Sequence, residues 1–113
     1  MESIESIIKT MNARPGMFFP NYSIFCIKSF LDGYLFATKN ESDLASMYQF
    51  QVFITKRFEQ ISTLSWDKII RLYCSSDYQA FHRFFELFEQ FLEQQSQEEV
   101  IDTAEKTYTQ ETL

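Results

Sequence analysis

Apolar residues recur at helical spacing from the start of the chain. The first apolar stripe, with the i, i+3, i+4, i+7 spacing of an amphipathic helix, consists of Ile4, Ile7, Ile8 and Met11. It predicts a helix over residues 3–11. Residues 13–22 follow with both prolines and one of the two glycines, which no helix interior accommodates. We expect a structured loop there, with Met17 and Phe18 folded back onto the core.

The next pattern predicts a helix over residues 23–38, with Ser23 as its N-cap. Its strongest apolar face consists of Ile24, Ile27, Leu31, Tyr34 and Leu35. Three phenylalanines lie outside that face: Phe25, Phe30 and Phe36. A helix that is apolar on most sides usually lies at the centre of a fold, so we predict a central position. Gly33 inside this helix predicts a bend or the close approach of another element.

A polar turn is expected at residues 39–42, and the segment that follows, residues 43–61, fits two patterns. Alternation at Tyr48, Phe50, Val52 and Ile54 is typical of a half-buried strand, whereas Phe50, Phe53, Ile54, Phe58 and Ile61 have helical spacing. We predict a helix, because the chain offers no second convincing strand to pair with the first. Residues 64–74 predict a shorter helix capped by Ser65. Its inward side chains are expected to be Trp66, Ile69, Ile70 and Tyr73.

The clearest amphipathic pattern begins near Ser76 or Asp77. Its apolar face consists of Tyr78, Phe81, Phe84, Phe85, Phe88, Phe91 and Leu92. Its polar face consists largely of Arg83, Glu86, Glu89, Gln90 and Glu93. After Gln94 the composition changes to Gln, Glu, Ser and Thr, which predicts a segment that is partly helical or disordered.

These patterns predict an all-α fold, a compact single-domain bundle of about five helices. A chain of 113 residues with 18% aromatic residues is large enough for one core. With only 2 Gly and 2 Pro, it lacks the turn residues that an all-β fold needs. We assign residues 1–95 to the helical domain and residues 96–113 to an acidic C-terminal tail.

The net charge of -6 is unevenly distributed along the chain. Residues 1–85 carry eight acidic and nine basic residues, whereas residues 86–113 carry eight acidic residues against Lys106 alone. The negative excess therefore begins inside the last helix. It predicts a negative surface that could attract a basic partner, made of Glu86, Glu89, Glu93, Glu98, Glu99 and Asp102. For the residues beyond Ser96, a merely solubilising tail is the competing interpretation.

Residues for chemistry are scarce. The only histidine, His82, lies in the middle of a predicted helix, where packing explains it better than general-base catalysis. Cys26 and Cys74 form neither a CxxC pair nor a disulfide framework, and we interpret both as small buried apolar residues. One histidine and two separate cysteines do not supply the usual ligand set of a soft metal, and phosphate-binding and zinc-protease motifs are absent from the sequence. We expect no catalytic residues, cofactor or metal.

Nucleic acid and membranes are not the expected partners. Lys56, Arg57, Lys68 and Arg71 could form a small basic strip on two helices. The body of the protein has nearly balanced charge, however, and phosphate binding requires a clear basic excess. The longest apolar run, residues 24–37, is interrupted by polar residues and is shorter than a membrane span. Without a secretory signal at the N-terminus, the expected location is the cytoplasm.

One stretch resembles a known family. Arg14-Pro15-Gly16-Met17-Phe18, then Ser23-Ile24, then Phe30-Leu31-Asp32-Gly33-Tyr34, resembles a pattern of small bacterial proteins with an RPGM(Y/F) loop followed by a helix with a Gly-Tyr pair. Some of these proteins look like immunity proteins of contact-dependent growth inhibition systems. The resemblance covers roughly residues 7–37, about a quarter of the chain, and the motif itself is structural.

The resemblance implies an antitoxin that binds a cognate toxin domain in a 1:1 complex and blocks its active site. A nuclease, with an RNase favoured, is the implied target, and a basic surface on it would match the negative charge described above. The alternative is a helical adaptor or self-associating module without a toxin partner, in which the surplus of aromatic residues forms an oligomer interface. An enzyme with an unrecognised site is a third possibility.

Overall fold

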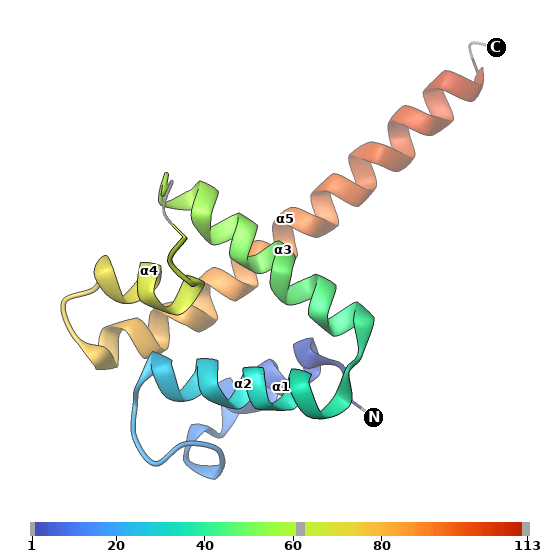
Figure 1. Cartoon of the computed structure of the whole chain (residues 1–113). Coiled ribbons are helices and arrows are strands. Elements are labelled where there is room, and N and C mark those ends of the chain that lie inside the picture. The colour runs from blue at the N-terminus through green and yellow to red at the C-terminus, as the bar shows by residue number, and fades with distance from the viewer. Residues whose placement is uncertain (1, 61–62, 112–113) are drawn as a thin grey trace.

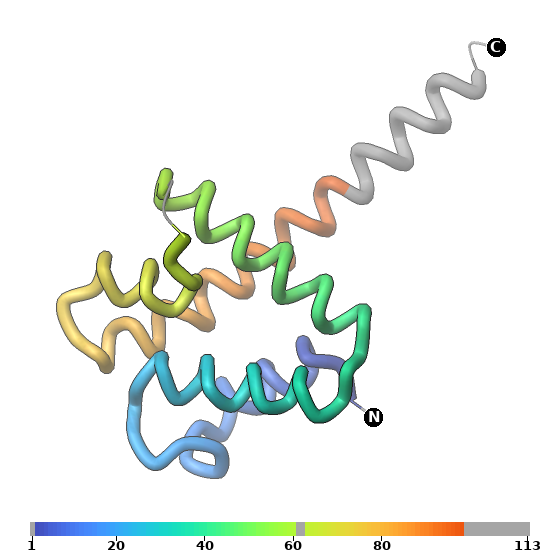
Figure 2. Tube along the Cα trace, viewed as in Figure 1, coloured from blue at the N-terminus to red at the C-terminus, as the bar shows by residue number. Residues whose placement is uncertain are grey.

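The computed structural model describes the backbone of residues 2–60 and 63–111 (Figure 1). Side chains are described for residues 2–60 and 63–98, the part of the chain that is coloured in Figure 2. Its elements are α1 (Ile4–Ala13), a 3₁₀ turn η1 (Pro15–Met17), α2 (Ile24–Thr38), α3 (Glu41–Arg57), α4 (Trp66–Leu72) and α5 (Asp77–Glu111) (Figure 1). The described residues contain no strand. The predicted all-α fold of about five helices is thus confirmed, including the helix chosen over a strand at residues 48–54.

Polar side chains set the helix starts. Ser23 Oγ accepts a hydrogen bond from the N–H of Phe25 at 3.2 Å, which confirms Ser23 as the N-cap of α2. Asn40 Oδ1 accepts one from the N–H of Asp43 at 3.0 Å. Because Asn40 caps α3, Glu41 already belongs to the helix, and the turn is shorter than predicted. Lys39 ends α2 in the left-handed conformation, with φ at 51°.

The centre of the fold is formed by α4 and α5. They pack against each other and each packs against α2 and α3, whereas α2 packs mainly against α4 and α5 (Figure 1). The prediction that residues 23–38 form the central helix is therefore wrong. The prediction failed because only one face of α2 is buried. Phe25, Phe30 and Phe36 lie outside that face and are 42%, 37% and 80% exposed.

Aromatic rings fill the centre of the core. Phe50 of α3 is fully buried, and its ring lies 5.4 Å from Trp66 of α4 and 5.6 Å from Phe84 of α5, edge to face in both pairs. Phe88 and Phe91 of α5 lie within 5.5 Å of the same ring. Such pairs each contribute about 0.5–1.5 kcal/mol beyond the area that they bury. The cluster therefore fixes α5 to α3 and α4.

Three side chains predicted to point inward are exposed instead. Met17 is 70% exposed, because the 3₁₀ turn places it on the outside of the loop, although Phe18 and Phe19 after it pack partly against the core. Tyr73 and Tyr78 are 53% and 61% exposed. Both lie at helix ends, one just after α4 and the other in the first turn of α5, away from the centre of the core.

Gly33 does not mark the close approach of another element. A Cβ atom added at this position would meet no other atom within 4 Å among the described residues. The glycine lies on the exposed side of α2, so the predicted close approach is wrong, and the bend, the other predicted alternative, stays a prediction. Ile61, predicted to face the core, lies outside the described residues. The division into a domain of residues 1–95 and a tail of residues 96–113 stays a prediction.

A buried carboxylate holds the N-terminal ends of two helices together. Asp43 of α3 is 6% exposed, and its Oδ1 accepts a hydrogen bond from the N–H of Ile4 at 3.2 Å, in the first turn of α1. Nearby, the hydroxyl of Tyr34 on α2 donates to the carbonyl oxygen of Glu2 at 2.5 Å. Partial burial, with the carboxylates of Asp43 and Glu2, raises the pKa of Tyr34.

Candidate protein-binding surface

The outer face of α5 carries a stripe of carboxylates. Glu86, Glu89 and Glu93 are exposed. Their spacing of three and four residues places them one above another on the helix. The opposite face of the same helix turns consists of buried phenylalanines, among them Phe84 and Phe88. The sequence prediction that these three glutamates share one exposed stripe is therefore confirmed. We call the stripe of Glu86, Glu89 and Glu93 the acidic ridge.

The three carboxylates of the ridge differ in their pairing. Glu86 Oε2 accepts a hydrogen bond from Arg83 Nη1 at 2.8 Å, so part of its charge is compensated. Glu89 and Glu93 form no ion pair with any side chain in the described part of the chain. These two carboxylates are therefore the ones available to a basic partner.

Glu98 lies on a different side of α5. It follows Glu93 by five residues, which is a rotation of about 140° around a helix with 3.6 residues per turn. Its Oε1 accepts a hydrogen bond from Gln94 Nε2 at 3.2 Å. The side chains of Glu99 and Asp102, the last two residues of the predicted surface, lie outside the described residues. The structure thus brings together the first three glutamates and separates the fourth from them.

A groove opens between α3 and α5 on the side of Glu98. It has a volume of about 500 Å³ and is lined by Tyr48, Gln49, Val52, Phe53, Lys56, Phe91, Gln94, Gln95 and Glu98. Across it, Gln95 Nε2 donates a hydrogen bond to Gln49 Oε1 at 2.5 Å. Tyr48 at the rim is 70% exposed. An exposed tyrosine beside a partly apolar groove is the kind of feature that protein partners use as an anchor.

A smaller recess lies between α1 and α5. Its volume is about 170 Å³, and it is lined by Ile8, Lys9, Asn12, Phe85, Phe88, Glu89 and Leu92. Glu89 therefore belongs both to the acidic ridge and to this recess. The outer surface of α5 combines exposed charge with a hollow on each side, which allows a partner to contact the helix from more than one direction.

Part of the sequence signal for the groove was the strand-like alternation, which was set aside when a helix was predicted. Tyr48 and Val52 are four residues apart and lie outside the buried stripe of α3, which contains Met47, Phe50 and Ile54. In the alternating pattern these residues indicated the inner face of a strand. On a helix the same spacing describes a second, weaker apolar stripe, and that stripe forms one wall of the groove.

His82 is the side chain best placed for chemistry, yet its surroundings are aromatic. Its ring is half-buried, stacks on Tyr22 at 5.8 Å and lies 4.4 Å from Tyr78, edge to face. Its buried Nε2 has no hydrogen-bond partner among the described residues. No carboxylate or nucleophile is hydrogen-bonded to this histidine in the part of the chain that the structure describes. The arrangement fits the packing role predicted for it.

The two cysteines are half-buried, which is more exposure than predicted. Cys26 Sγ lies 3.4 Å from Asn21 Oδ1, and Cys74 packs at the edge of the core. Desolvation raises the pKa of the Cys74 thiol, against the opposing effect of Arg83 and Arg71. In residues 2–60 and 63–98, no group of three or more His, Cys, Asp or Glu side chains could hold a metal ion.

The basic strip is spread over α3 and α4, as predicted, and two of its members, Arg71 and Arg57, make contacts within the protein. Arg71 Nε donates to Asp77 Oδ1 at 2.7 Å, and Arg71 Nη1 donates to the carbonyl oxygen of Cys74 at 3.1 Å. Arg57 lies over the ring of Phe58, with 5.4 Å between the guanidinium carbon and the ring centroid. Lys56 contributes to the wall of the groove between α3 and α5.

Comparison of the chain with protein-family models, with curated proteins and with solved structures finds no match. Within the described residues, no helix combines the length and the apolar character that crossing a membrane requires.

Proposed function

We propose that this protein is an immunity protein that binds a cognate bacterial toxin domain and blocks its active site. The observation that carries the proposal is the acidic ridge of α5, in which Glu89 and Glu93 are exposed and without an ion pair among the described residues. The resemblance of residues 7–37 to immunity proteins supplies the class of partner.

The chemistry of the ridge favours a nuclease as the target, with an RNase as the first candidate. A nuclease binds a polyanion, so its active-site cleft carries positive charge. Carboxylates held on a rigid helix complement such a cleft, because they accelerate encounter and orient the partner before short-range contacts form. The phenylalanines behind the ridge hold α5 in place, which lowers the entropic cost of binding.

Short-range contacts would come from the hollows beside the ridge. The groove between α3 and α5 offers Tyr48 at its rim and Phe53 and Phe91 in its wall. A side chain of the toxin inserted there would be removed from water, and such central apolar contacts usually dominate affinity. The ridge would then govern the association rate, and the groove would govern the lifetime of the complex.

The first test is co-expression with the toxin domain encoded by the neighbouring gene. We expect a 1:1 complex that survives purification and restores growth to cells that produce the toxin. A purified pair that does not associate, or growth arrest that persists although this protein is produced, would refute the proposed function.

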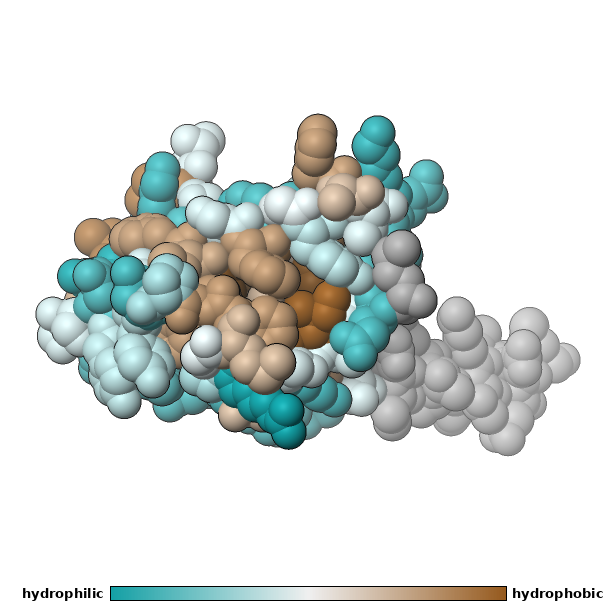
Figure 3. Space-filling model, turned by 90° about the horizontal axis from the view of Figure 1, so that it is seen from below, coloured by the Kyte–Doolittle hydropathy of each residue, from teal (hydrophilic) through white to brown (hydrophobic). Residues whose placement is uncertain are grey.

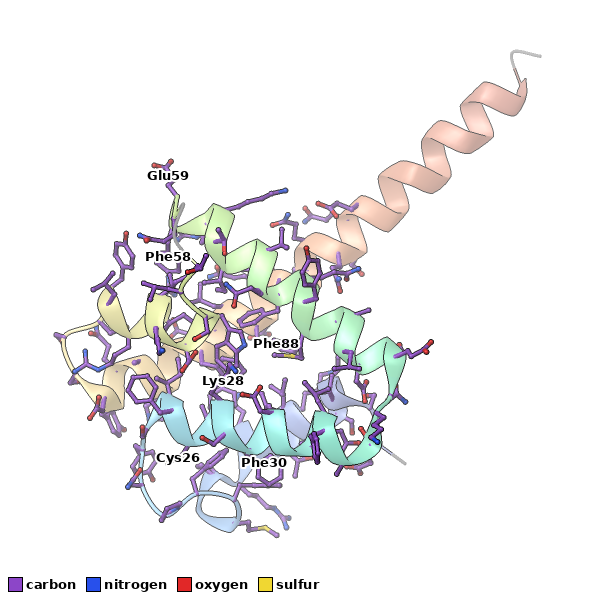
Figure 4. The ribbon with its side chains drawn as sticks, in the orientation of Figure 1. Cys26, Lys28, Phe30, Phe58, Glu59 and Phe88 are labelled. Atoms are coloured by element: carbon purple, nitrogen blue, oxygen red, sulfur yellow. The ribbon has the colours of Figure 1, made fainter. Side chains whose placement is uncertain are left out.

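The second test reverses the charge of the ridge. In the double variant Glu89→Lys/Glu93→Lys we expect association about tenfold slower at low salt and less sensitive to salt, with unchanged folding. Stopped-flow mixing at several salt concentrations measures both quantities. The single variant Glu93→Lys is also compared with Glu59→Lys, which makes the same charge change elsewhere. Glu59 is an exposed carboxylate just beyond the C-terminal end of α3 (Figure 4). If the control slows association as much as Glu93→Lys does, net charge and not the ridge is responsible.

The alternative function, a helical adaptor or self-associating module, is favoured by a different surface. Phe25, Phe30 and Phe36 are exposed on α2 and belong to neither the ridge nor the groove. A module of this kind would act without a toxin, so a protein that cannot rescue growth but changes mass with concentration would support it.

A further inference from the structure

The exposed side of α2 carries a single charged side chain, that of Asp32, at its edge. Around the helix, the residues of this side fall within one arc, which we call the α2 face: Phe25, Cys26, Ser29, Phe30, Gly33, Phe36 and Ala37. All are apolar or small. Figure 3 shows apolar side chains gathered over the side of the molecule formed by α2 and the loop before it. The largest apolar patch on the surface of a soluble protein is often an interaction site.

The described residues leave the middle of the α2 face uncovered. A Cβ atom added to Gly33 would meet nothing within 4 Å. Cys26 and Phe30 point towards the loop before α2, whereas Lys28 points towards α4 and lies over the ring of Trp66 at 6.0 Å (Figure 4). The loop covers one side of the face: the rings of Phe18 and Phe19 lie 5.5 and 6.2 Å from that of Phe30, and Asn21 Oδ1 lies 3.4 Å from Cys26 Sγ. The other side, with Phe25, Gly33 and Phe36, remains open to another molecule.

Two large side chains lie at equal distances from the middle of the α2 face, and Phe30 lies near the middle at its other edge. Phe25 and Phe36 mark its two ends on one edge, and the small residues Ser29 and Gly33 lie between them. Two copies of α2 packed antiparallel about a twofold axis near residues 30 and 31 would place Phe25 of one copy beside Phe36 of the other. The small residues would meet at the axis, where they permit close approach of the two helices.

We propose that this protein forms a twofold symmetric dimer through the α2 face. The area available agrees with a reversible interface. Taking about 200 Å² for a phenylalanine side chain, the exposed parts of Phe25, Phe30 and Phe36 offer roughly 320 Å² per copy. Two copies together offer roughly 640 Å² from these rings, to which the exposed Ser29, Gly33 and Ala37 add, so the interface lies at or below the lower limit of specific interfaces. We therefore expect a weak, reversible dimer.

Charge favours a second copy over a toxin at this face. A nuclease domain would present basic residues, and the one carboxylate at the edge of the α2 face, that of Asp32, is already paired with Lys28. Two copies would not repel each other there, because residues 1–85 carry nearly balanced charge and the acidic excess lies in residues 86–113. The acidic ridge shares no residue with the α2 face, so each subunit of the dimer could still bind one toxin.

Sedimentation velocity of the full chain, from about 1 to 300 μM, tests the dimer. We expect the mass to double with concentration. Gly33→Leu should weaken association at least tenfold with its helical circular dichroism unchanged, because leucine fits the open space of the monomer and blocks close approach. Phe36→Lys should do the same. Leu72→Lys, in the last turn of α4 and 65% exposed, is the matched control and should dimerise normally.

A protein that stays monomeric over the whole range would overturn the proposal. So would a dimer that Leu72→Lys weakens as much as Phe36→Lys does, since that result would place the interface elsewhere. No toxin is present in the experiment, so its outcome is independent of the proposed function. A Gly33→Leu variant that remains monomeric and still rescues growth would support both proposals together.

Discussion

The helices α2 and α5 are both rich in phenylalanine, but the phenylalanines of α5 are buried in the core and those of α2 are exposed to solvent. In α5, Phe81, Phe84, Phe85, Phe88 and Phe91 are all at most 6% exposed. In α2, each of the three phenylalanines is at least 37% exposed. The difference lies in the position of each residue around its helix. The rings of α5 recur every three or four residues on one face, whereas those of α2 flank a stripe of isoleucine and leucine that occupies the core.

This contrast shows that aromatic content alone does not predict burial. The polar residues of the two helices decide which face turns inward. The outer side of α5 is marked by glutamates, which keep it in water. The corresponding side of α2 carries phenylalanines and small residues in place of glutamates. Its exposure therefore cannot be recognised from the sequence and becomes clear only once all the helices are packed together. What remains outside on α2 is apolar surface, and what remains outside on α5 is charge.

The largest expected effect is a difference in stability between the two helices when one phenylalanine ring is removed from each. Phe84 is fully buried, so Phe84→Ala should lower the free energy of unfolding by about 3–5 kcal/mol. Phe36 is 80% exposed, and Phe36→Ala should change the free energy of unfolding by no more than about 0.5 kcal/mol. Urea unfolding followed by circular dichroism measures both. Similar losses in the two variants would contradict the contrast, and Phe84→Leu provides the comparison if the alanine variant does not fold.

Local patterns allowed most of the fold to be predicted. Caps such as Ser23 and the spacing of Ile4, Ile7 and Ile8 act within a few residues, so they are visible in the sequence. The central position of α4 and α5 was missed because it depends on which helices meet, and no local signal records that. Tyr73 and Tyr78 were assigned to the core for the same reason. Their spacing continues the apolar stripes of α4 and α5, but at these helix ends no neighbouring helix among the described residues covers them.

The candidate site was predictable only in part. The first three glutamates of the ridge share a face because of their spacing alone, and the helix carries them as expected. Glu98 was grouped with them by charge, although five residues of helix turn it towards the groove. The groove itself requires α3 and α5 to lie side by side at Gln49 and Gln95, a pair far apart in the sequence.

A smaller effect of opposite sign is expected at Gly33. The added methyl group of Gly33→Ala meets no neighbouring atom, and alanine loses less backbone entropy than glycine on forming a helix. The variant should therefore be more stable by about 0.5–1 kcal/mol, measured by urea unfolding at a concentration where the protein is monomeric. Ala45→Gly, at an exposed position of α3, should lower stability by a similar amount. A loss of stability in Gly33→Ala would indicate that the α2 face is covered within one chain, and the contrast with α5 would then disappear.

The smallest effect concerns the inner edge of α2, where Tyr34 donates its hydroxyl hydrogen to the carbonyl oxygen of Glu2. The pKa of Tyr34 is raised in the folded protein by desolvation and by the carboxylates of Asp43 and Glu2, so folding favours the protonated hydroxyl. This contribution to stability is fully present below the ordinary tyrosine pKa of about 10 and is lost as the pH rises through the raised value. The free energy of unfolding of the wild type should therefore fall more steeply between about pH 9 and 11 than that of Tyr34→Phe. Tyr48→Phe, at an exposed position of α3, serves as the control for removing a tyrosine hydroxyl. Equal slopes for the wild type and Tyr34→Phe would mean that the hydroxyl is as free in the folded chain as in the unfolded one, and that the inner edge of α2 is held by its isoleucine and leucine side chains alone.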